Sequence, residues 1–336
     1  MRILGIETSC DETAASVIEE YKILSNIVSS QIVHKKYGGI VPEFASREQI
    51  GAIVPIVEAA LADADTSLKD IDGIAVTCGP GLAGSLLTGL NFAKGLSLAS
   101  DKKYIAVNHL EGHLFAHRLS NPDFNPPFLF LLISGGHTQL IHVINWGEYK
   151  IIGATLDDAA GEAFDKVAKM LGMEYPGGPK IDESAQNGDP DYIKFPRALL
   201  GKGYDFSFSG LKTSVLYYLK KQKESAIKKH LEDISASFQK AVVDVLTAKS
   251  INAANHLNLN RIAVGGGVSA NSALRAELSS KGEAEGIEVV FPPLSLTTDN
   301  GAMIAAVGSY YLERGIFSPL SMNVYPNLAI GEVIPQ

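Results

Sequence analysis

The sequence predicts an α/β protein built from two similar lobes, and three observations support this fold class. First, 336 residues suffice for about two domains of ordinary size. Second, one order of apolar segments occurs twice: three strands, then a helix, a strand, a helix, a strand and a helix. Third, Ile74-Ala75-Val76 recurs 188 residues later as Ile262-Ala263-Val264, and a glycine break and a helical pattern follow each copy. We therefore expect a duplicated fold with a ligand cleft between the lobes.

The first lobe is expected over residues 1–120. Short apolar segments predict its strands, and apolar residues at helical spacing predict its helices. In chain order the predicted elements are the strands Arg2–Glu7, Ala14–Glu19 and Lys22–Ser29, a helix around Ile50–Leu61, the strand Ile71–Thr77, a helix over Leu82–Ala99, the strand Tyr104–Val107 and a helix that starts at His109. The first three strands are expected to form a β-meander.

The second lobe is expected over residues 125–315, after a proline-rich hinge at Asn121–Pro127. It contains an insertion at about residues 175–209, and residues 316–336 form a tail that we expect to pack on the first lobe. The predicted elements are the strands Phe128–Ile133, Thr138–Val143 and Tyr149–Ala154, helices over Asp158–Leu171 and Ile234–Asn255, the strand Arg261–Val264, a helix from about Ala270, the strand Ile287–Phe291 and a final helix into Tyr311.

The charge of the chain argues against a general nucleic-acid-binding surface. Its formal net charge is −8, from 29 basic and 37 acidic residues, so no DNA partner is predicted. A nucleic-acid substrate would need local basic residues or a partner that supplies them. The one basic run comprises Lys220, Lys221, Lys223, Lys228 and Lys229, and we interpret it as a solvated helix face.

Cysteine content and hydropathy indicate the compartment. Cys10 and Cys78 are the only cysteines, which is too few for a disulfide framework or a cysteine-rich zinc site. The longest apolar runs, such as Leu82–Leu90, fall well short of the roughly 18 residues that a membrane span needs. No apolar leader follows Met1. We therefore expect a soluble cytoplasmic protein that has no membrane partner.

Two histidines and one aspartate are candidate metal ligands. His109 and His113 lie four residues apart, so on a helix they share one face and form a clamp for a transition metal. Asp299 alone is typical of a helix N-cap, but the repeat places it in the second lobe where His109 stands in the first. The resulting His2Asp set, with open positions for substrate, suits iron(II) or zinc. His117, one turn further along, is interpreted as structural.

Three glycine-containing breaks follow predicted strands, at Gly79–Gly81, Ser134–Gly136 and Gly265–Gly267. Without a Cβ in the way, backbone N–H groups there can point at phosphate oxygens, although each break alone is typical of a tight turn. None has the spacing of a Walker A loop. Together the three breaks favour a site for a nucleotide phosphate. Asp165 and Asp182 are candidates to accept hydrogen bonds from ribose hydroxyls, and the alternative is that both are ordinary surface residues.

Specific motifs extend this interpretation, because they resemble those of the universal tRNA threonylcarbamoyladenosine transferase family. They span nearly the whole chain in order, and several are long and specific, although residues 180–203 are too variable to align. The motifs are Gly5–Thr13, Tyr37–Glu43, Asn108–His113, Ser134–Gln139, Asp157–Lys166, Tyr175–Pro179, Phe206–Thr213, Gly265–Asn271 and Thr298–Met303.

The resemblance implies an actin- and Hsp70-like (ASKHA) fold, in which duplicated ribonuclease H-like lobes enclose a cleft with a metal. It implies transfer of a threonylcarbamoyl group from threonylcarbamoyl-AMP to N6 of an adenosine in tRNA, which forms t6A. That adenosine lies next to the anticodon, at position 37, in tRNAs that read codons beginning with A. Catalysis would be metal-assisted direct attack by the N6 amine.

The resemblance also implies residue roles and partners. The metal ligands of the family fall on His109, His113 and Asp299, with iron(II) favoured and zinc as the alternative. A TsaB-like paralogue is expected to dock on the apolar helix Leu82–Ala99, and a TsaE-like ATPase to join it. The family's contacts to the adenylate substrate fall on Leu132, Ile133, Ser134, Gly135, Gly136, Asp165, Gly178, Asp182 and Asn271.

Rival interpretations come from other classes of protein. A zinc protease would place a glutamate immediately after the first histidine, but here Glu111 comes two positions later and points away from both ligands. A small-molecule kinase or a chaperone-like ATPase of the same fold needs no histidine pair. A non-enzymatic scaffold needs no His2Asp set. The transferase is therefore the preferred hypothesis.

Overall fold

The computed structural model describes residues 1–30 and 41–332. The chain divides into two compact units, one formed by Met1–Phe124 with Thr298–Gln336 and the other by Asn125–Thr297. Each unit contains a five-stranded sheet of the same topology. Residues 37–40 of the predicted motif Tyr37–Glu43 lie outside the described part of the chain.

The sheet of the first unit has the strand order β3-β2-β1-β4-β5. The antiparallel meander consists of β1 (Arg2–Glu7), β2 (Glu12–Glu19) and β3 (Lys22–Ser30), as the sequence predicts. Two parallel strands, β4 (Gly73–Gly79) and β5 (Lys103–Asn108), extend it beyond β1. The parallel strands bring the end of β5 beside the end of β4, and a helix begins directly after it.

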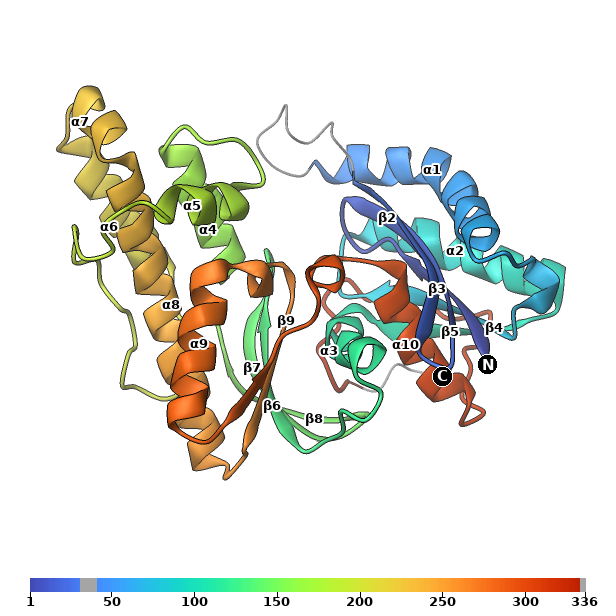
Figure 1. Cartoon of the computed structure of the whole chain (residues 1–336). Helices are drawn as coiled ribbons and strands as arrows, with labels where there is room; N and C mark the ends of the chain where they lie inside the picture. The colour runs from blue at the N-terminus through green and yellow to red at the C-terminus, as the bar shows by residue number, and fades with distance from the viewer. Residues whose placement is uncertain (31–40, 333–336) are drawn as a thin grey trace. The chain divides into compact units, whose positions relative to one another are not determined.

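Helices cover both faces of this sheet (Figure 1). On one face lie α1 (Pro42–Asp63) and α2 (Ala83–Ser100), which bury Leu4, Ile6 and their neighbours. The other face carries α10 (Gly301–Leu312), which also packs against α3 (His109–Ser120). A Cβ on Gly5 would lie 2.2 Å from the carbonyl oxygen of Gly301, so β1 and the start of α10 approach closely because glycine occupies that position.

The second unit repeats the topology with the strand order β10-β9-β6-β7-β8. The meander consists of β6 (Phe128–Ile133), β7 (Thr138–Asn145) and β8 (Glu148–Ala154), and the parallel strands are β9 (Arg261–Gly265) and β10 (Glu288–Val290). The helices are α4 (Ala160–Met170), α5 (Gly177–Ala185), α6 (Ser209–Lys220), α7 (Glu224–Lys229), α8 (Leu231–His256) and α9 (Ser272–Ala284). Short 3₁₀ turns complete both units, at Leu68–Asp70, Gly267–Ala270 and Leu294–Leu296.

The predicted strands are all present, with ends that differ by at most two residues. The observed units differ from the expected lobes at one boundary. Residues 298–315, expected in the second lobe, belong to the first unit, because α10 packs on β1, β4 and α3.

The tail that follows α10 lies along the first unit. The amide N–H of Ser318 donates to the carbonyl of Tyr104, and that of Tyr325 donates to the carbonyl of Cys78. A Cβ on Gly79 would lie 2.0 Å from the carbonyl oxygen of Tyr325, so the glycine at the end of β4 makes room for the tail. Within the described ranges, no helix combines the length and the apolar character that crossing a membrane requires.

Candidate functional site

Two buried histidines occupy the first two turns of α3. The side chain of Asn108 caps this helix by accepting a hydrogen bond from the Leu110 N–H at 2.8 Å. His109 and His113 are only 8% and 2% exposed, and their ring centroids lie 4.8 Å apart. The spacing of four residues therefore does place both imidazoles on one face of the helix.

Asp299 lies beside this pair. Its Oδ1 is 3.6 Å from Nε2 of His109 and 3.3 Å from Nε2 of His113. One ligand atom from each of the three residues lies within 4.8 Å of the others. The three side chains that the sequence selected as metal ligands are thus brought together in one place.

The interpretation of Asp299 as a helix cap is wrong, because the next residue performs that role. The Asn300 side chain accepts a hydrogen bond from the Met303 N–H at 3.0 Å and starts α10. Asp299 stands just before the cap, where its carboxylate turns toward the histidines.

Asp299 belongs to the same unit as His109 and His113, whereas the sequence placed it in the second lobe. Gly112 explains how α10 reaches them: a Cβ there would lie 2.9 Å from Cδ1 of Ile304 and 3.1 Å from Cγ of Met303. The absence of a side chain at Gly112 lets α3 and α10 pack closely, and this packing sets the position of Asp299.

Glu7, at the end of β1, contacts the Nδ1 side of the His109 ring. Its Oε2 is 3.1 Å from Nδ1 of His109, and the Ser9 hydroxyl lies 3.2 Å from the same nitrogen. The fully buried Glu7 carboxylate also accepts hydrogen bonds from the Thr77 hydroxyl and the Ser9 N–H. A proton on Nδ1 directed at Glu7 leaves the Nε2 lone pair for a metal.

The residues fit a divalent transition metal. Neither ring nitrogen of His113 forms a hydrogen bond with another described residue, although this side chain is almost fully buried. Burial lowers the pKa of His109, but the carboxylates of Asp299 and Glu7 outweigh it and raise that pKa to about 9. Two imidazole nitrogens with one carboxylate form a mixed N/O donor set that suits iron(II) or zinc.

Further acidic side chains surround the set. Burial, followed by repulsion from Asp299 and Asp11, raises the pKa of Glu12 to about 10. Burial and the same two carboxylates also raise the pKa of the Cys10 thiol. The carboxylates of Asp299 and Asp11, which contribute to both shifts, are charges that a bound cation would offset.

Glu111 takes no part in this set. Its carboxylate accepts a hydrogen bond from the hydroxyl of Tyr311 on α10, at 2.8 Å. A metalloprotease needs its glutamate beside the metal-bound water. The structure therefore gives Glu111 a packing role and argues against the protease alternative.

In the second unit, the loop Ser134–Gly136 follows β6. The loop is closed by the Ser134 N–H, which donates to the carbonyl of His137 at 2.8 Å. Gly135 and Gly136 are exposed, and a Cβ on either would meet nothing within 4 Å. Leu132 and Ile133 are fully buried in the core, so any contact that they make to a ligand is through the backbone.

The other predicted contacts gather around α5. Oδ1 of Asp165 accepts a hydrogen bond from the Gly177 N–H at 2.7 Å, next to Gly178. Asp182 accepts from the Ser272 N–H at 3.0 Å and from Nδ2 of Asn271 at 3.2 Å. Asp165 and Asp182 thus fasten α5 at its two sides.

Sequence reasoning missed several residues that shape these sites. Gln239 accepts a hydrogen bond from Nδ2 of Asn271 at 2.7 Å and holds that amide in place. Glu7 is a charged residue at the end of an otherwise apolar strand, which is the signal that could have identified it. The third glycine break has a structural role: Gly266 has φ +86°, and a Cβ there would lie 2.4 Å from the carbonyl oxygen of Ile133.

Comparisons with known proteins agree with the motifs. The profile of the family described as "TsaD: tRNA N6-adenosine threonylcarbamoyltransferase" matches residues 22–306. The tRNA N6-adenosine threonylcarbamoyltransferase of Kosmotoga olearia is 52% identical over 332 residues, which cover 98% of this chain and 99% of the relative. That of Clostridium perfringens is 52% identical over 333 residues and covers 98% of each chain.

Solved structures support the fold class. The structure of HypF from T. kodakarensis matches 93% of this chain and 48% of its own, with a TM-score of 0.64 and 14% identity. At this identity the likeness concerns the fold alone. With the duplicated sheets, it confirms the predicted α/β fold of the actin/Hsp70-like type.

Proposed function

The chain belongs to the tRNA N6-adenosine threonylcarbamoyltransferase family, and from this premise we propose that it forms t6A in tRNA. The group transferred would be threonylcarbamoyl, the donor threonylcarbamoyl-AMP, and the acceptor N6 of adenosine 37 in tRNAs that read codons beginning with A. The observation that carries the proposal is the convergence of His109, His113 and Asp299 within 4.8 Å. We further propose that this takes place in the cytoplasm.

His109, His113 and Asp299 would hold one divalent metal, and we propose iron(II), with zinc as the alternative that elemental analysis distinguishes. When bound there, the ion supplies Lewis-acid chemistry to the carbonyl group of the donor. The chain's own contribution is orientation. Glu7 fixes the tautomer of His109, and the packing of α10 against Gly112 fixes Asp299.

The second unit would hold the adenylate. The exposed backbone of Gly135 and Gly136 offers N–H groups to a phosphate, because no side chain covers the loop. Asp165 and Asp182 would accept hydrogen bonds from the ribose, with Gly178 and Asn271 beside them. Leu132, Ile133 and Ser134 would support the loop through their backbone.

The reaction needs no covalent intermediate on the protein, because the adenylate already carries a good leaving group. The N6 amine attacks the carbamoyl carbon, the bond from that carbon to the phosphate oxygen breaks, and AMP leaves. N6 loses one proton in the process, and the departing AMP phosphate or solvent water accepts it. Since the N6 lone pair is delocalised into the purine, orientation of the reactants and stabilisation of charge on the carbonyl oxygen are the main catalytic demands.

We also propose that a TsaB-like paralogue docks on the outer surface of α1 and α2, and that a TsaE-like ATPase joins the assembly. These two helices pack against each other. They expose large apolar side chains: Ile50, Val54, Leu87 and Leu98. Exposed apolar residues on neighbouring helices suit a helical protein partner.

One experiment tests the reaction. The chain, with its partners added in a parallel sample, is incubated with threonylcarbamoyl-AMP and unmodified tRNA, and the nucleosides are then analysed by mass spectrometry. We expect t6A at the adenosine next to the anticodon. Transfer of phosphate from ATP to a small molecule, with no modified nucleoside in either sample, would contradict the proposal and favour the kinase alternative.

A further inference from the structure

One segment of the second unit is strongly basic. Residues 194–223 contain seven lysine and arginine side chains and one acidic side chain, Asp205, in a chain whose formal net charge is −8. Two of the seven are held in ion pairs, with Asp244 and with Asp158. The other five form no ion pair with any residue that the structure describes: Lys194, Lys202, Lys220, Lys221 and Lys223.

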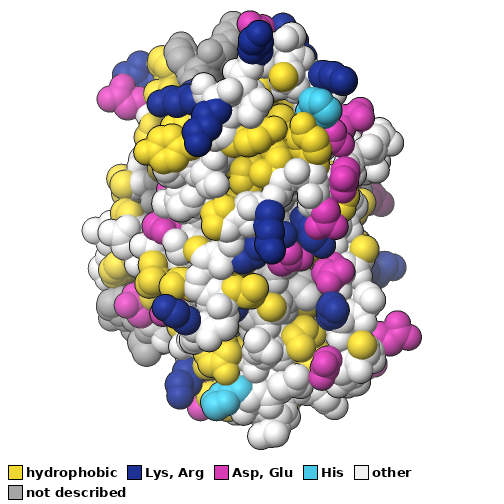
Figure 2. All heavy atoms as spheres, turned by 90° about the vertical axis from the view of Figure 1, so that its left-hand side faces the viewer, with side chains coloured by type: hydrophobic (Ala, Val, Ile, Leu, Met, Phe, Trp, Pro, Cys, Tyr) yellow, Lys and Arg dark blue, Asp and Glu magenta, His cyan; other side chains and the backbone are white. Residues whose placement is uncertain are grey.

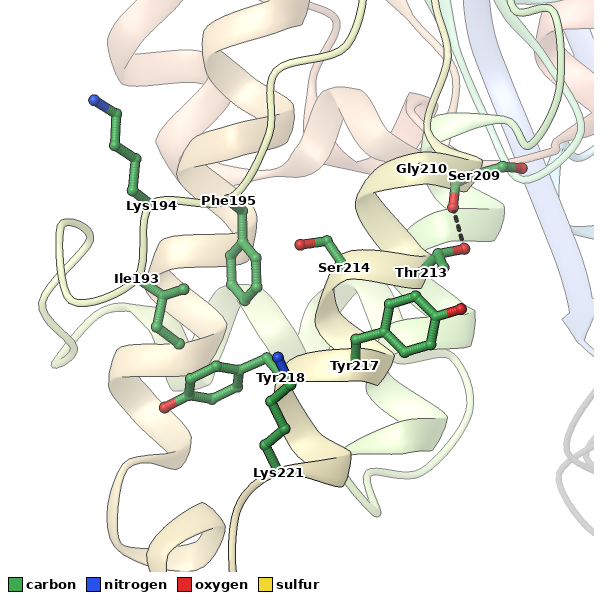
Figure 3. Close-up of a pocket in the computed structure, with 10 residues that line it drawn as sticks. All are labelled: Ile193, Lys194, Phe195, Ser209, Gly210, Thr213, Ser214, Tyr217, Tyr218 and Lys221. Atoms are coloured by element: carbon green, nitrogen blue, oxygen red, sulfur yellow. Dashed lines mark hydrogen bonds between the residues drawn. The ribbon is translucent and has the colours of Figure 1, made fainter.

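A groove of about 610 Å³ lies within this segment, and we call it the α6 groove. It is lined by Ile193 and Phe195 and, on α6, by Ser214, Tyr217 and Tyr218. In Figure 3 the ring of Tyr218 turns toward Ile193, whereas the ring of Tyr217 turns to the opposite side of α6. The ammonium group of Lys221 points up between the two tyrosines, whereas Lys194 extends away from the groove at its rim. The groove therefore combines aromatic rings, hydroxyl groups and cations.

The surroundings of the groove are polarised. Figure 2 shows the face that carries α6 and α7, where hydrophobic side chains gather in the upper half. Lysine and arginine side chains lie mainly at the left of these hydrophobic groups, and acidic side chains lie mainly at their right. An anionic ligand would therefore be directed to the lysine side of the groove.

Tyr217 is the feature that selects the ligand. Its side chain is 59% exposed, on the side of α6 away from the buried residues Leu211, Val215 and Leu219. An exposed aromatic ring next to unpaired lysines is the pattern by which proteins bind single-stranded nucleic acid, because a base stacks on the ring and the lysines contact phosphates. A helical protein partner fits less well, since lysine is depleted from the centres of protein–protein interfaces.

We propose that the α6 groove binds an unpaired nucleotide of the tRNA substrate, with its base on Tyr217 and its phosphate at Lys221, while Lys194 at the rim contacts the backbone of a neighbouring nucleotide. The inference rests on the proposed function, because that function makes tRNA the substrate. The nucleotide is not the adenosine that is modified, since no groove residue belongs to the metal set or the adenylate set. This local basic surface is how an acidic chain would hold tRNA.

The test is equilibrium binding of unmodified tRNA to the full-length chain over a range of salt concentrations. We expect Tyr217→Ala to weaken binding about tenfold and Tyr217→Phe to retain it, because stacking needs the ring and not the hydroxyl. Lys194→Gln and Lys221→Gln should each reduce the slope of log K against log salt by about one. Lys281→Gln, which changes an exposed lysine on α9, is the matched control and should change neither quantity.

Two further measurements separate stacking from charge and from folding. A duplex RNA of the same length has no unpaired base, so Tyr217→Ala should bind it as the wild type does. In Tyr217→Trp, the new indole fluorescence should be quenched when tRNA is added, with the wild-type chain reporting the single natural tryptophan, Trp146. Thermal unfolding should be unchanged for all of these variants, because each replaced side chain is exposed.

The proposal is overturned if Tyr217→Ala and the lysine variants bind tRNA with wild-type affinity and salt dependence. It is also overturned if Tyr217→Ala weakens duplex binding as much as tRNA binding, or if the variants lose only a protein partner. A different result would contradict the proposed function and leave the groove proposal intact: the wild type would bind tRNA through the α6 groove but form no t6A.

Discussion

The carboxylate of Glu7 lies 3.1 Å from Nδ1 of His109, while Nε2 of the same ring faces Asp299 at 3.6 Å. Nδ1 therefore forms the hydrogen bond that orients the ring, and Nε2 is the nitrogen available to a metal. Because Glu7 is fully buried and anchored by Thr77 and Ser9, the orientation of the ring is fixed from the strand and does not depend on a bound ion.

Replacing Glu7 by glutamine should lower the affinity for the metal without removing the site. The amide oxygen can still accept from Nδ1, but the negative charge that makes the imidazole a better ligand is lost, and we expect affinity to fall about 10- to 100-fold. Competition with a chromophoric chelator measures this directly. Glu19→Gln, which alters an exposed ion pair of the same sheet, is the control. Equal affinities of Glu7→Gln and the wild type would show that Glu7 does not position the ligand.

Loss of the histidine pair should remove the metal altogether. The double variant His109→Ala/His113→Ala leaves only Asp299, and one carboxylate does not hold a transition metal at stoichiometric occupancy. Elemental analysis of the purified protein checks this, and circular dichroism verifies the fold. His117→Gln should keep its metal, because that ring packs at a tilt against Phe124, with the ring centroids 5.5 Å apart, and lies outside the His109, His113 and Asp299 set. Full occupancy in the double variant would refute the assignment.

Metal binding should release protons at neutral pH. In the metal-free chain, burial lowers the pKa of His109, but Asp299 and Glu7 raise it to about 9, so the ring is protonated at pH 7.5. A metal needs the neutral ring, and binding should therefore release at least one proton and tighten as pH rises toward 9. Titration calorimetry in buffers with different ionisation enthalpies measures the number. Binding that releases no proton would contradict this account.

The raised pKa of His109 also predicts how the stability of the metal-free chain depends on pH. A folded pKa above the usual histidine value means that protonation of His109 stabilises the metal-free fold. That contribution is complete below about pH 6.5, and it disappears as pH rises through 9. Thermal unfolding of the metal-free chain across this range should show the loss, and His109→Gln should lack it.

The fold was predictable because hydrophobic segments and glycine breaks are local signals that occur twice. The β6–β9 pairing joins Phe130 to Ala263, and the β1–β4 pairing joins Gly5 to Ala75 in the same way. That His109, His113 and Asp299 come together was also predicted from the sequence. The sequence did not show which unit supplies Asp299, because the position of Asp299 depends on the packing of α10 against Gly5 and Gly112. Glu7 was missed since its role depends on a hydrogen bond to a residue 102 positions away.

Gly136→Val should abolish binding of an AMP-containing ligand while the fold is kept. A Cβ at Gly136 would meet no atom of the described residues within 4 Å, so the protein itself leaves room for a larger residue there. Calorimetry should show affinity reduced at least tenfold, with little change in the unfolding temperature. Gly266→Val is the contrasting variant: it places a Cβ 2.4 Å from the Ile133 carbonyl oxygen at a positive φ, and should destabilise the protein. Unchanged affinity in Gly136→Val would remove this loop from the ligand site.

Cys10→Ala should retain substantial threonylcarbamoyl transfer. Burial, Asp11 and Asp299 raise the pKa of the Cys10 thiol, so it stays protonated and is a poor nucleophile. The adenylate is already activated, and a cysteine intermediate would add a step without making the N6 attack easier. By contrast, His113→Ala should lower the rate by roughly two or more orders of magnitude, because His113 would be a ligand of the proposed metal, which would supply Lewis-acid chemistry to the donor. Rates are compared by counting t6A per tRNA at saturating donor. A threonylcarbamoyl-cysteine adduct trapped by mass spectrometry, together with an inactive Cys10→Ala chain, would overturn the direct-attack mechanism.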